Sequence, residues 1–303
     1  MKRVFTGLVM TICFIALFIS CSKDNNDDPI EPSNVETRLT KETIKEMNNG
    51  TLYTDVSMYF YDNSKRLLKV VRESGHSKGS SEVDYIYNTD GTLNKTISSY
   101  EFVESYYYEN NKIVYVVYSG SDGSDTLFLF YNTDGKIQRT THNRNHSIYS
   151  GKVFETIDYS LDVNGRVTKG IVNFKNYDGE YNLWEYFIDT TLFLYSPNGN
   201  LTSYITNRFD MLTDERTWYK YEYEYDSKLN YWTTKHFPKE ELFIEMLHPD
   251  NDYATNNTIL TTYTSSTGDY EANIRNINSY NSKGYPLLIS ANWGSIELEY
   301  SDN

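Results

Sequence analysis

One pattern of about eleven residues recurs along the chain and constrains its fold more than any other feature. Each copy has two mainly aromatic residues separated by one other residue, and usually an Asn or Asp follows them. A short polar stretch, often ending in Gly, and then an apolar residue complete the copy, as in LFYNTDGKIQR. Eight copies align: Tyr59–Lys69, Tyr85–Lys95, Tyr106–Tyr115, Leu129–Arg139, Tyr159–Lys169, Phe193–Ser203, Tyr223–Thr233 and Ser279–Leu288. The closing LEYSDN matches the first half of a ninth copy.

This pattern predicts a β-hairpin. Alternate residues of a strand point to the same face, so the two aromatic rings lie together on one side. The Asn or Asp accepts hydrogen bonds from backbone N–H groups in the turn, and Gly adopts the positive φ that closes it, as expected for Asn132 and Gly135. Glycine is missing near Lys65, Asn111 and Leu229, in the first, third and seventh copies, and we expect longer or looser turns there.

The composition agrees with a β fold. The 303 residues include 30 Tyr, 14 Phe and 4 Trp but only 6 Pro, and Tyr and Thr favour half-buried pleated surfaces. TWYKYEYEYD (Thr217–Asp226) places four Tyr on one strand face and Trp, Lys and two Glu on the other. We therefore predict an all-β antiparallel meander of repeated hairpins, about sixteen to twenty strands, forming a large curved sheet or a wide soluble barrel with at most one or two short helices.

Two segments outside the repeat are ambiguous. TRLTKETIKEMNNG (Thr37–Gly50) contains helix-forming Glu and Lys, but RLTKETI resembles RVTKGIV in the return half of a unit, and we assign it to a strand. PKEELFIEMLHPD (Pro238–Asp250) fits a short helix that interrupts the repeat. Residues 37–303 are expected to form a single β-hairpin repeat domain.

Residues 1–20 resemble a bacterial lipoprotein signal peptide. Lys2 and Arg3 precede an apolar run, Val4–Ile19, that is too short for a stable membrane span. The run ends in LFISC, which predicts cleavage before Cys21 and attachment of lipid to its sulfur, although Phe18 holds the place where Leu is usual. A plain secretory signal and an uncleaved anchor are the alternatives. The mature domain would contain no cysteine that could form a disulfide.

The charge of the chain indicates its surroundings. Cleavage would remove two of the 28 basic residues and none of the 42 acidic ones, which changes the net charge from −14 to −16 and disfavours nucleic acid as a partner. Residues 21–36 would form a lipidated, disordered acidic tether. Because the acidic run after Cys21 resembles the surface-export signal of certain Gram-negative lineages, we expect a lipid-anchored outer-membrane protein exposed on the cell surface.

The repeat also resembles known proteins. The Y-x-Y-N-x-D-G-K-L-x-K pattern is similar to the YD repeats of RHS-type proteins. Together with the lipoprotein start and the acidic tether, it resembles bacterial surface lipoproteins of a family of unknown function that is described as having a porin-like β fold. The resemblance covers about residues 37–303 and implies an architecture without implying any catalytic residue.

The alternation within Thr217–Asp226 argues against a barrel that spans a membrane. A strand that faces lipid needs an apolar outer face, and Lys or Arg at the middle of a bilayer costs about 2–4 kcal/mol. One face of this strand carries Lys220, Glu222 and Glu224, and the other carries only Tyr, which prefers the membrane interface to hydrocarbon. We expect lipid only at Cys21.

Little in the sequence indicates catalysis or metal binding. His142 and His146 in HNRNH lack a third ligand, and a zinc site needs three or four. Oxygen pairs such as Asn132 and Asp134 lack the rest of a calcium loop and are explained by their turns. No nucleophile elbow, phosphate loop or catalytic Cys is present. We therefore expect no catalytic residue, no metal and no cofactor, and keep a hydrolase as a third hypothesis because so acidic a chain contains many carboxylate pairs.

Aromatic side chains remain the best candidates for a binding site. Rings that stack on sugars, with Asp or Asn to hold hydroxyl groups, are typical of carbohydrate sites, and the candidates are Trp184, Trp218, Trp232 and Trp293. The Tyr face of Thr217–Asp226 is better explained as the buried face of a sheet. The first hypothesis is a non-enzymatic surface lipoprotein that binds or presents a glycan, host polymer or protein. The second is a structural or accessory subunit of an outer-membrane assembly.

Overall fold

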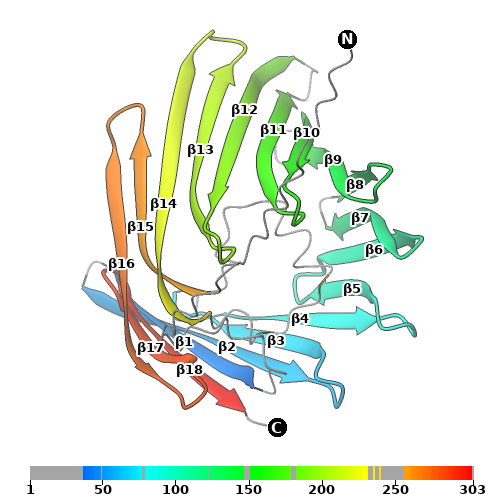
Figure 1. The fold of residues 1–303 in the computed structure, drawn as a ribbon. Helices are drawn as coiled ribbons and strands as arrows, with labels where there is room; N and C mark the ends of the chain where they lie inside the picture. Colours follow the sequence, from blue (N-terminus) through cyan, green and yellow to red (C-terminus); the bar gives the residue numbers. More distant parts are fainter. Residues whose placement is uncertain are drawn as a thin grey trace, which may run out of the picture. The chain divides into compact units, whose positions relative to one another are not determined.

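The repeated hairpins form a sheet of 18 antiparallel strands in the computed structural model (Figure 1). The structure describes residues 37–301 apart from 49, 77–78, 122, 147–150, 179–181, 231–234, 236–238 and 240–255, and these belong to one compact unit, Glu36–Asn303. The strands are β1 (Arg38–Asn48), β2 (Thr51–Tyr61), β3 (Leu67–Glu73), β4 (Ser80–Tyr87), β5 (Leu93–Ser98), β6 (Val103–Glu109), β7 (Lys112–Gly120), β8 (Gly123–Tyr131), β9 (Ile137–His146), β10 (Gly151–Leu161), β11 (Val167–Tyr177), β12 (Leu183–Tyr195), β13 (Leu201–Asp210), β14 (Arg216–Leu229), β15 (Asn256–Ser265), β16 (Tyr270–Tyr280), β17 (Pro286–Ala291) and β18 (Gly294–Ser301).

The sheet closes on itself into a barrel. Each strand pairs with the next in the chain, and β18 also pairs with β1. The predicted all-β meander is thus confirmed, and the barrel is the form that it takes. β1 is a strand, as its likeness to a return half predicts, and Tyr300 of β18 lies opposite Leu39. The two ends of the chain therefore complete a ninth hairpin between them, which leaves no open sheet edge.

The turns have the predicted chemistry. Asn132 accepts hydrogen bonds from the backbone N–H groups of Asp134 and Lys136 at 3.0 and 2.9 Å, while Gly135 has a φ of 76°. The first-unit prediction of a looser turn is wrong, because Lys65 adopts a φ of 67° and its N–H donates to Asp62 O at 2.9 Å, as in the glycine turns. The third turn is tighter than predicted, because Asn110 and Asn111 both take positive φ within a two-residue connection.

The seventh unit does not form the tight hairpin predicted for Tyr223–Thr233. β14 continues to Leu229 and pairs with β15, with register irregularities after Glu224 and after Tyr225. Asp226 still accepts the Lys228 N–H at 2.9 Å. The helix predicted for Pro238–Asp250 lies outside the described residues, apart from Lys239.

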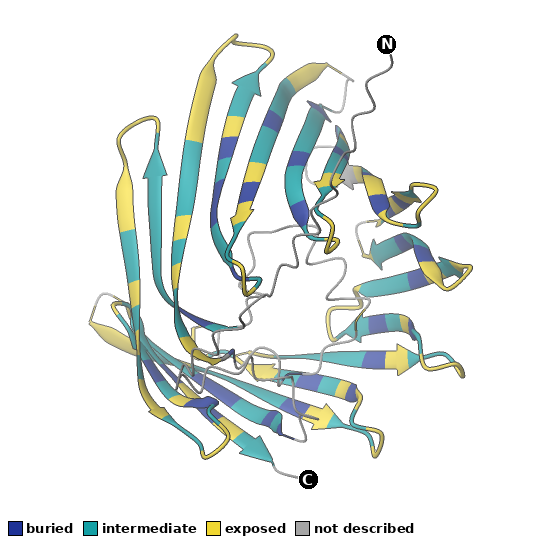
Figure 2. Ribbon diagram, in the orientation of Figure 1, coloured by how far each residue is buried: buried dark blue, intermediate teal, exposed yellow. Residues whose placement is uncertain are grey.

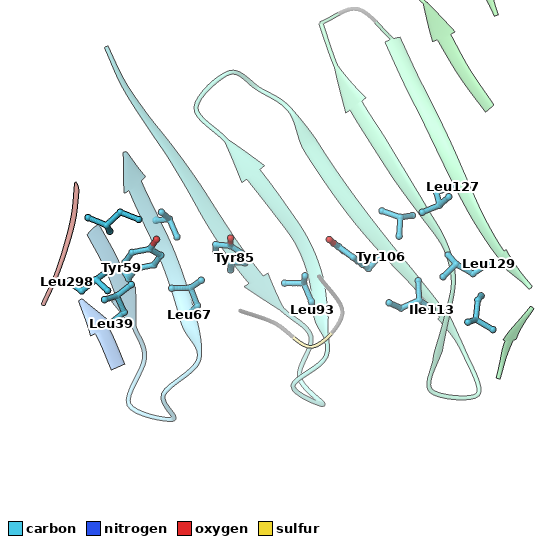
Figure 3. Close-up of a cluster of buried hydrophobic side chains, with 14 of the residues drawn as sticks. Leu39, Tyr59, Leu67, Tyr85, Leu93, Tyr106, Ile113, Leu127, Leu129 and Leu298 are labelled. Carbon is cyan, nitrogen blue, oxygen red and sulfur yellow. The ribbon is translucent and has the colours of Figure 1, made fainter. Parts of the chain in front are cut away.

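The core lies on the inner face of the barrel. The first apolar residue after most of the repeat turns is buried, as is Leu39 in the corresponding position of β1, and Figure 3 shows Leu39, Leu67, Leu93 and Ile113, each at most 5% exposed. The first ring of the aromatic pair packs beside them, for example Tyr85 at 5%. The Tyr ladder of β14 faces the same side, where Tyr219, Tyr221 and Tyr223 pack on a second, smaller cluster.

In most copies of the repeat, the second aromatic ring of the pair links neighbouring hairpins. Its hydroxyl donates to the backbone carbonyl of the buried apolar residue in the preceding unit, for example Tyr87 to Leu67 O at 2.8 Å and Tyr131 to Ile113 O at 2.8 Å. The same bond is made by Tyr61, Tyr108, Tyr195, Tyr225 and Tyr300. Burial raises the pKa of Tyr131 to about 12, so the hydroxyl keeps its proton and remains a donor. The repeat therefore encodes bonds between units as well as within them.

The barrel has two distinct ends. In a closed meander, alternate connections lie at opposite ends. The repeat turns, such as β4–β5 and β8–β9, lie at one end with the start of β1, and we call this the repeat end. The other connections, such as β1–β2 and β13–β14, lie at the far end. Figure 2 shows buried residues in bands along the strands and exposed residues mainly at strand ends and loops.

Candidate functional site

The structure separates the four candidate tryptophans. Trp184 in β12 and Trp218 in β14 are 58% and 39% exposed. Trp293, in the β17–β18 connection, is half-buried and packs against the larger core cluster, so its ring belongs to the core. Trp232 lies outside the described residues. Only Trp184 and Trp218 therefore remain as candidates for ligand contact within the described part of the chain.

Trp218 borders a groove of about 430 Å³ on the outer face of β12–β14. Register pairs Trp218 with Asn207, and Asn207 with Thr190, so two small polar side chains lie beside the indole in neighbouring strands. The next outer residues on these strands are larger. The groove residues are Ile188, Thr190, Asn207, Arg208, Phe209, Arg216, Thr217 and Trp218. Small residues flanked by larger ones create the hollow.

The groove combines flat apolar rings with polar donors. The Arg216 guanidinium lies over the Phe209 ring, 5.0 Å from its centroid, which orients the cation without neutralising it. The Trp218 carbonyl accepts a hydrogen bond from the Ser266 N–H at 2.8 Å, which fixes the backbone that carries the indole. The groove therefore offers an indole face, a second ring, an amide and a guanidinium in one place.

A charged pair on the inner face supports the strands behind the groove. Arg208 donates from Nε and Nη2 to the two carboxylate oxygens of Asp189 at 2.9 and 2.8 Å. Its guanidinium lies 3.8 Å from the centroid of the Phe187 ring. The hydrogen bonds that Arg208 donates to the Asp189 carboxylate raise the pKa of Arg208. This two-point contact joins β12 to β13 in one register.

Trp184 does not belong to the groove. It lies six residues before Thr190 on β12, which is about 20 Å along an extended strand. No groove residue precedes Ile188 on that strand. The sequence therefore identified two exposed tryptophans, and the fold places one of them, Trp218, beside this groove.

A longer surface feature adjoins the groove on the outer face. Two neighbouring register rows run across the strands, and we call them together the outer belt. The first row, from β6 to β14, is Tyr107, Tyr115, Phe128, Thr141, Thr156, Asn173, Ile188, Phe209 and Arg216. The second row, from β4 to β12, is Ile86, Lys95, Ser105, Val117, Thr126, Asn143, Phe154, Lys175 and Tyr186. The belt contains no Asp or Glu, and single-strand patterns did not reveal it.

A second hollow, of about 640 Å³, lies among the turns of the repeat end. Two of its charged groups already have partners within the protein. Lys112 Nζ lies 5.2 Å from the centroid of the Tyr131 ring, and Asp90 accepts hydrogen bonds from the N–H and hydroxyl of Thr92. We therefore favour the groove beside Trp218 as the binding site.

Sequence reasoning missed a buried ion pair. Lys235 Nζ lies 3.0 Å from a carboxylate oxygen of Glu42, with both side chains at most 7% exposed. That oxygen also accepts the Tyr59 hydroxyl at 2.9 Å. Burial lowers the pKa of Lys235, while Glu42 opposes that shift. Lys235 follows β14 in the chain and contacts Glu42 of β1, so the pair places Lys235 on the inner face of the barrel.

The histidine pair is placed too far apart for one ion. His142 and His146 lie on β9, where four residues of extended strand span about 13 Å. His142 Nδ1 instead accepts a hydrogen bond from Arg144 at 3.0 Å. Within the described ranges, no group of three His, Cys, Asp or Glu residues is arranged to hold a metal. In that part of the chain, no helix has the length and apolar character to cross a membrane.

Comparisons with known proteins give few matches. No family model and no curated protein matches the sequence. A porin-like protein from Bacteroides vulgatus ATCC 8482 is similar over 88% of this chain and 99% of its own, with 11% identity and a TM-score of 0.43. A porin-like protein from Bacteroides uniformis ATCC 8492 is similar over 87% of this chain and 98% of its own, with 10% identity and a TM-score of 0.41.

A third similar structure, TcdB2-TccC3-TEV, is matched over 86% of this chain but only 14% of its own length, with 10% identity and a TM-score of 0.26. The first two structures carry the porin-like description that the resemblance of the repeat implies. Identities and TM-scores this low do not assign a role to the chain. The function is therefore argued from its own residues.

Proposed function

We propose that this protein is a non-enzymatic lipoprotein of the outer membrane, anchored through Cys21 and exposed on the cell surface, whose barrel binds a carbohydrate in the groove beside Trp218. The groove is the single observation that carries the binding role. A partly exposed indole and the Phe209 ring provide faces for the apolar side of a sugar. Asn207, Thr190 and Arg216 supply hydrogen-bond donors for its hydroxyl groups.

The position of the groove suits a tethered protein. Arg38, the first residue of β1, lies at the repeat end. Trp218 is the third residue of β14, which begins at the far end. A lipid on Cys21 would thus hold the repeat end nearer the membrane and leave the groove accessible from outside.

Charged side chains on the outer face favour a barrel surrounded by water. Lys41 and Glu299 form an ion pair at 2.7 Å across β1 and β18. Lys69 and Glu82 pair at 3.1 Å across β3 and β4, and Arg139 pairs with Asp158 at 2.6 Å across β9 and β10. Because Lys or Arg facing lipid costs about 2–4 kcal/mol at mid-bilayer, we infer that lipid contact is confined to the anchor.

The binding role is tested by calorimetry on the full chain in detergent, with a panel of soluble oligosaccharides. We expect Trp218→Ala to abolish binding of any sugar that the wild-type protein binds. Trp184→Ala, which removes a more exposed indole outside the groove, should leave the affinity unchanged. Equal loss in the two variants, or no binding to any sugar, would refute the carbohydrate role.

The anchor is tested separately in cells. Cys21→Ala should prevent lipid attachment and move the protein out of the membrane fraction. Protease added to intact cells should degrade the wild-type barrel if it is on the surface. A Cys21→Ala protein that stays in the membrane fraction would refute the lipid anchor without affecting the groove.

The alternative role, an accessory subunit of an outer-membrane assembly, has weaker support. The closed sheet has no free edge to which a partner strand could add. Its remaining support is the exposed rings of Phe128 and Phe130 in β8, at 38% and 48%. A partner that binds there would be lost on replacing these rings, while sugar binding at Trp218 would persist.

A further inference from the structure

We propose that the outer belt is a binding track for an extended acidic polysaccharide, that is, a chain of sugars bearing carboxylate or sulfate groups. This inference rests on the proposed carbohydrate role of the groove, because the first row of the belt ends in Phe209 and Arg216. It extends the site from one groove to a surface that crosses many strands, and it specifies the charge and the length of the ligand.

The first observation is the charge of the belt. The chain has 42 Asp and Glu against 28 Lys and Arg, yet both register rows lack carboxylates, while Lys95, Lys175 and Arg216 lie within them. None of the three forms an ion pair among the described residues. The basic residues Lys41, Lys69 and Arg139, elsewhere on the outer face, are each neutralised by a carboxylate. The belt is therefore locally cationic on an acidic protein.

Local charge decides binding here, because ions screen distant charges. At physiological ionic strength, the screening length is about 8 Å. A polyanion on the belt interacts with the basic groups beneath it more strongly than with carboxylates on other faces. The negative net charge therefore opposes weak, general attachment and still permits attachment along the belt.

The second observation is a platform of rings at the end of the belt away from the groove. Tyr107 and Tyr115 stack with centroids 4.3 Å apart, and the Phe128 ring follows 6.0 Å from Tyr115. Tyr107 and Phe128 are 42% and 38% exposed although they lie within strands β6 and β8. A stacked pair and a third, tilted ring, from three adjacent strands, offer neighbouring apolar surfaces for successive sugars.

The third observation is the continuity between this platform and the groove. Thr141, Thr156 and Asn173 fill the intervening positions of the row with short polar side chains, so nothing bulky or anionic separates the two ring sites. Neighbouring strands lie about 4.8 Å apart, so the eight steps from β6 to β14 span about 38 Å. A single sugar would reach only one ring site, whereas an extended chain would contact both.

The proposal is tested by varying the length and the charge of the polysaccharide and measuring its binding by calorimetry on the full protein in detergent. Pectic polygalacturonate fragments of increasing length are the probe, and their carboxyl-reduced forms are the neutral control. We expect the longest acidic fragments to bind at least about a hundredfold more tightly than disaccharides, because a second contact acts at high effective concentration. Affinity should fall with added salt and with carboxyl reduction.

Variants separate the track from the groove. The double variant Tyr107→Ala, Phe128→Ala should weaken long fragments by about tenfold or more and leave disaccharide binding unchanged. Phe60→Ala, which removes a 47% exposed ring of β2 outside the belt, should change neither. Lys95→Gln with Lys175→Gln should reduce the salt dependence for long fragments.

Several outcomes would refute the proposal that the outer belt is a binding track. These are affinity that does not depend on length, equal binding of acidic and neutral chains, or an unaltered double variant. If Trp218→Ala still removes disaccharide binding in those cases, the groove stands alone. If no fragment binds and the double variant changes the oligomeric state in light scattering, the belt is a protein contact. Binding of single-stranded DNA as tight as that of the polysaccharide would also refute specificity for acidic sugars.

Discussion

At the repeat end of the barrel, the inner face carries fully buried leucines such as Leu67 and Leu93. Towards the far end, the same inner face carries Asp125 in β8, Glu155 in β10 and Arg208 in β13. Both ends belong to the same strands, so the difference arises within each strand. An apolar ring at one end and charged groups at the other indicate that the stability of the fold is concentrated at the repeat end.

The comparison indicates which residues can be substituted without loss of the fold. The repeated residues supply the turn, the buried apolar side chain and the tyrosine hydroxyl bond, and all of these lie near the repeat end. Strand residues outside the repeat contribute few of these turn, core and hydroxyl interactions. The groove beside Trp218 and the ring platform at Tyr107 both lie on the outer face, where no core contact restricts the side chains.

The largest effect should come from breaking the buried ion pair. Lys235→Met leaves the Glu42 carboxylate buried without its cation, and we expect a loss of about 3–5 kcal/mol in the free energy of unfolding. The double variant Glu42→Gln, Lys235→Met should recover most of this loss, because no lone charge remains and an oxygen still accepts the Tyr59 hydroxyl. Urea unfolding followed by circular dichroism measures both values. Equal losses in the single and double variants would contradict the electrostatic explanation.

Leucine truncation compares a buried inner side chain beside a repeat turn with an exposed outer side chain near the far end. Leu67→Ala removes a side chain with no exposed surface next to the repeat turn, and we expect a loss of about 2–5 kcal/mol. Leu52→Ala, near the far end of the partner strand β2, removes a side chain that is 58% exposed and should cost less than about 0.5 kcal/mol. Similar losses at the two positions would show that stability is not concentrated at the repeat end.

Turn glycines provide a smaller, two-way test. Gly91→Ala forces a residue with a side chain to a φ of 89°, and we expect destabilisation by about 1–2 kcal/mol. Lys65→Gly should instead stabilise the protein by up to about 1 kcal/mol, because Lys65 already holds that conformation at a φ of 67°. Melting temperatures from calorimetry report both signs. A stabilising Gly91→Ala would show that positive φ is not strained in these turns.

The tyrosine hydroxyl bond should make a contribution of about 1 kcal/mol per unit. Tyr87→Phe removes the donor to Leu67 O without changing the ring, and we expect a loss of about 0.5–1.5 kcal/mol. Tyr53→Phe is the control at the far end, where the ring stacks on His76 at 3.8 Å and should keep that contact. Chemical denaturation distinguishes the two. No difference between the variants would mean that the bond is replaced by water at no cost.

The sequence predicted the repeat end far better than the far end, for a physical reason. Turns and alternation are local, so Asn132, Gly135 and the strand faces could be assigned from neighbouring residues. The likeness of residues 38–44 to a return half predicted a strand there, but not its pairing with β18, in which Tyr300 lies opposite Leu39 from the other end of the chain. The groove beside Trp218 needs the register of three strands, and the Glu42–Lys235 pair joins residues 193 positions apart. Neither could be read from local patterns.

Replacing the turn carboxylates should have the smallest effect on stability. We expect this effect, a change in how stability depends on pH, at both ends of the barrel. Hydrogen bonds from the Arg166 N–H, then from its side chain and the Asn164 N–H, hold the pKa of Asp162 below its usual range. A lowered pKa in the folded state means that the stabilisation is present above the unfolded pKa of about 3.9 and is lost as pH falls through the folded value. Asp162→Asn keeps the acceptor oxygen, as Asn132 does in its own turn, so the melting temperature should fall less between about pH 5 and pH 2 than in the wild-type protein.

Asp210 extends this test to the far end. Its carboxylate accepts N–H groups of Leu212 and Thr213 at 2.8 and 3.0 Å, and these bonds lower its pKa as well. Asp210→Asn should therefore flatten the acid side of the stability curve in the same sense as Asp162→Asn, while Asp134→Asn, whose carboxylate forms no ion pair among the described residues, should not. If only the repeat-end variant responds to acid, the two ends differ in turn chemistry as well as in core. If both variants change the response to acid, the difference between the ends lies in the buried side chains. Substitutions that alter binding should then be tolerated at the polar far end.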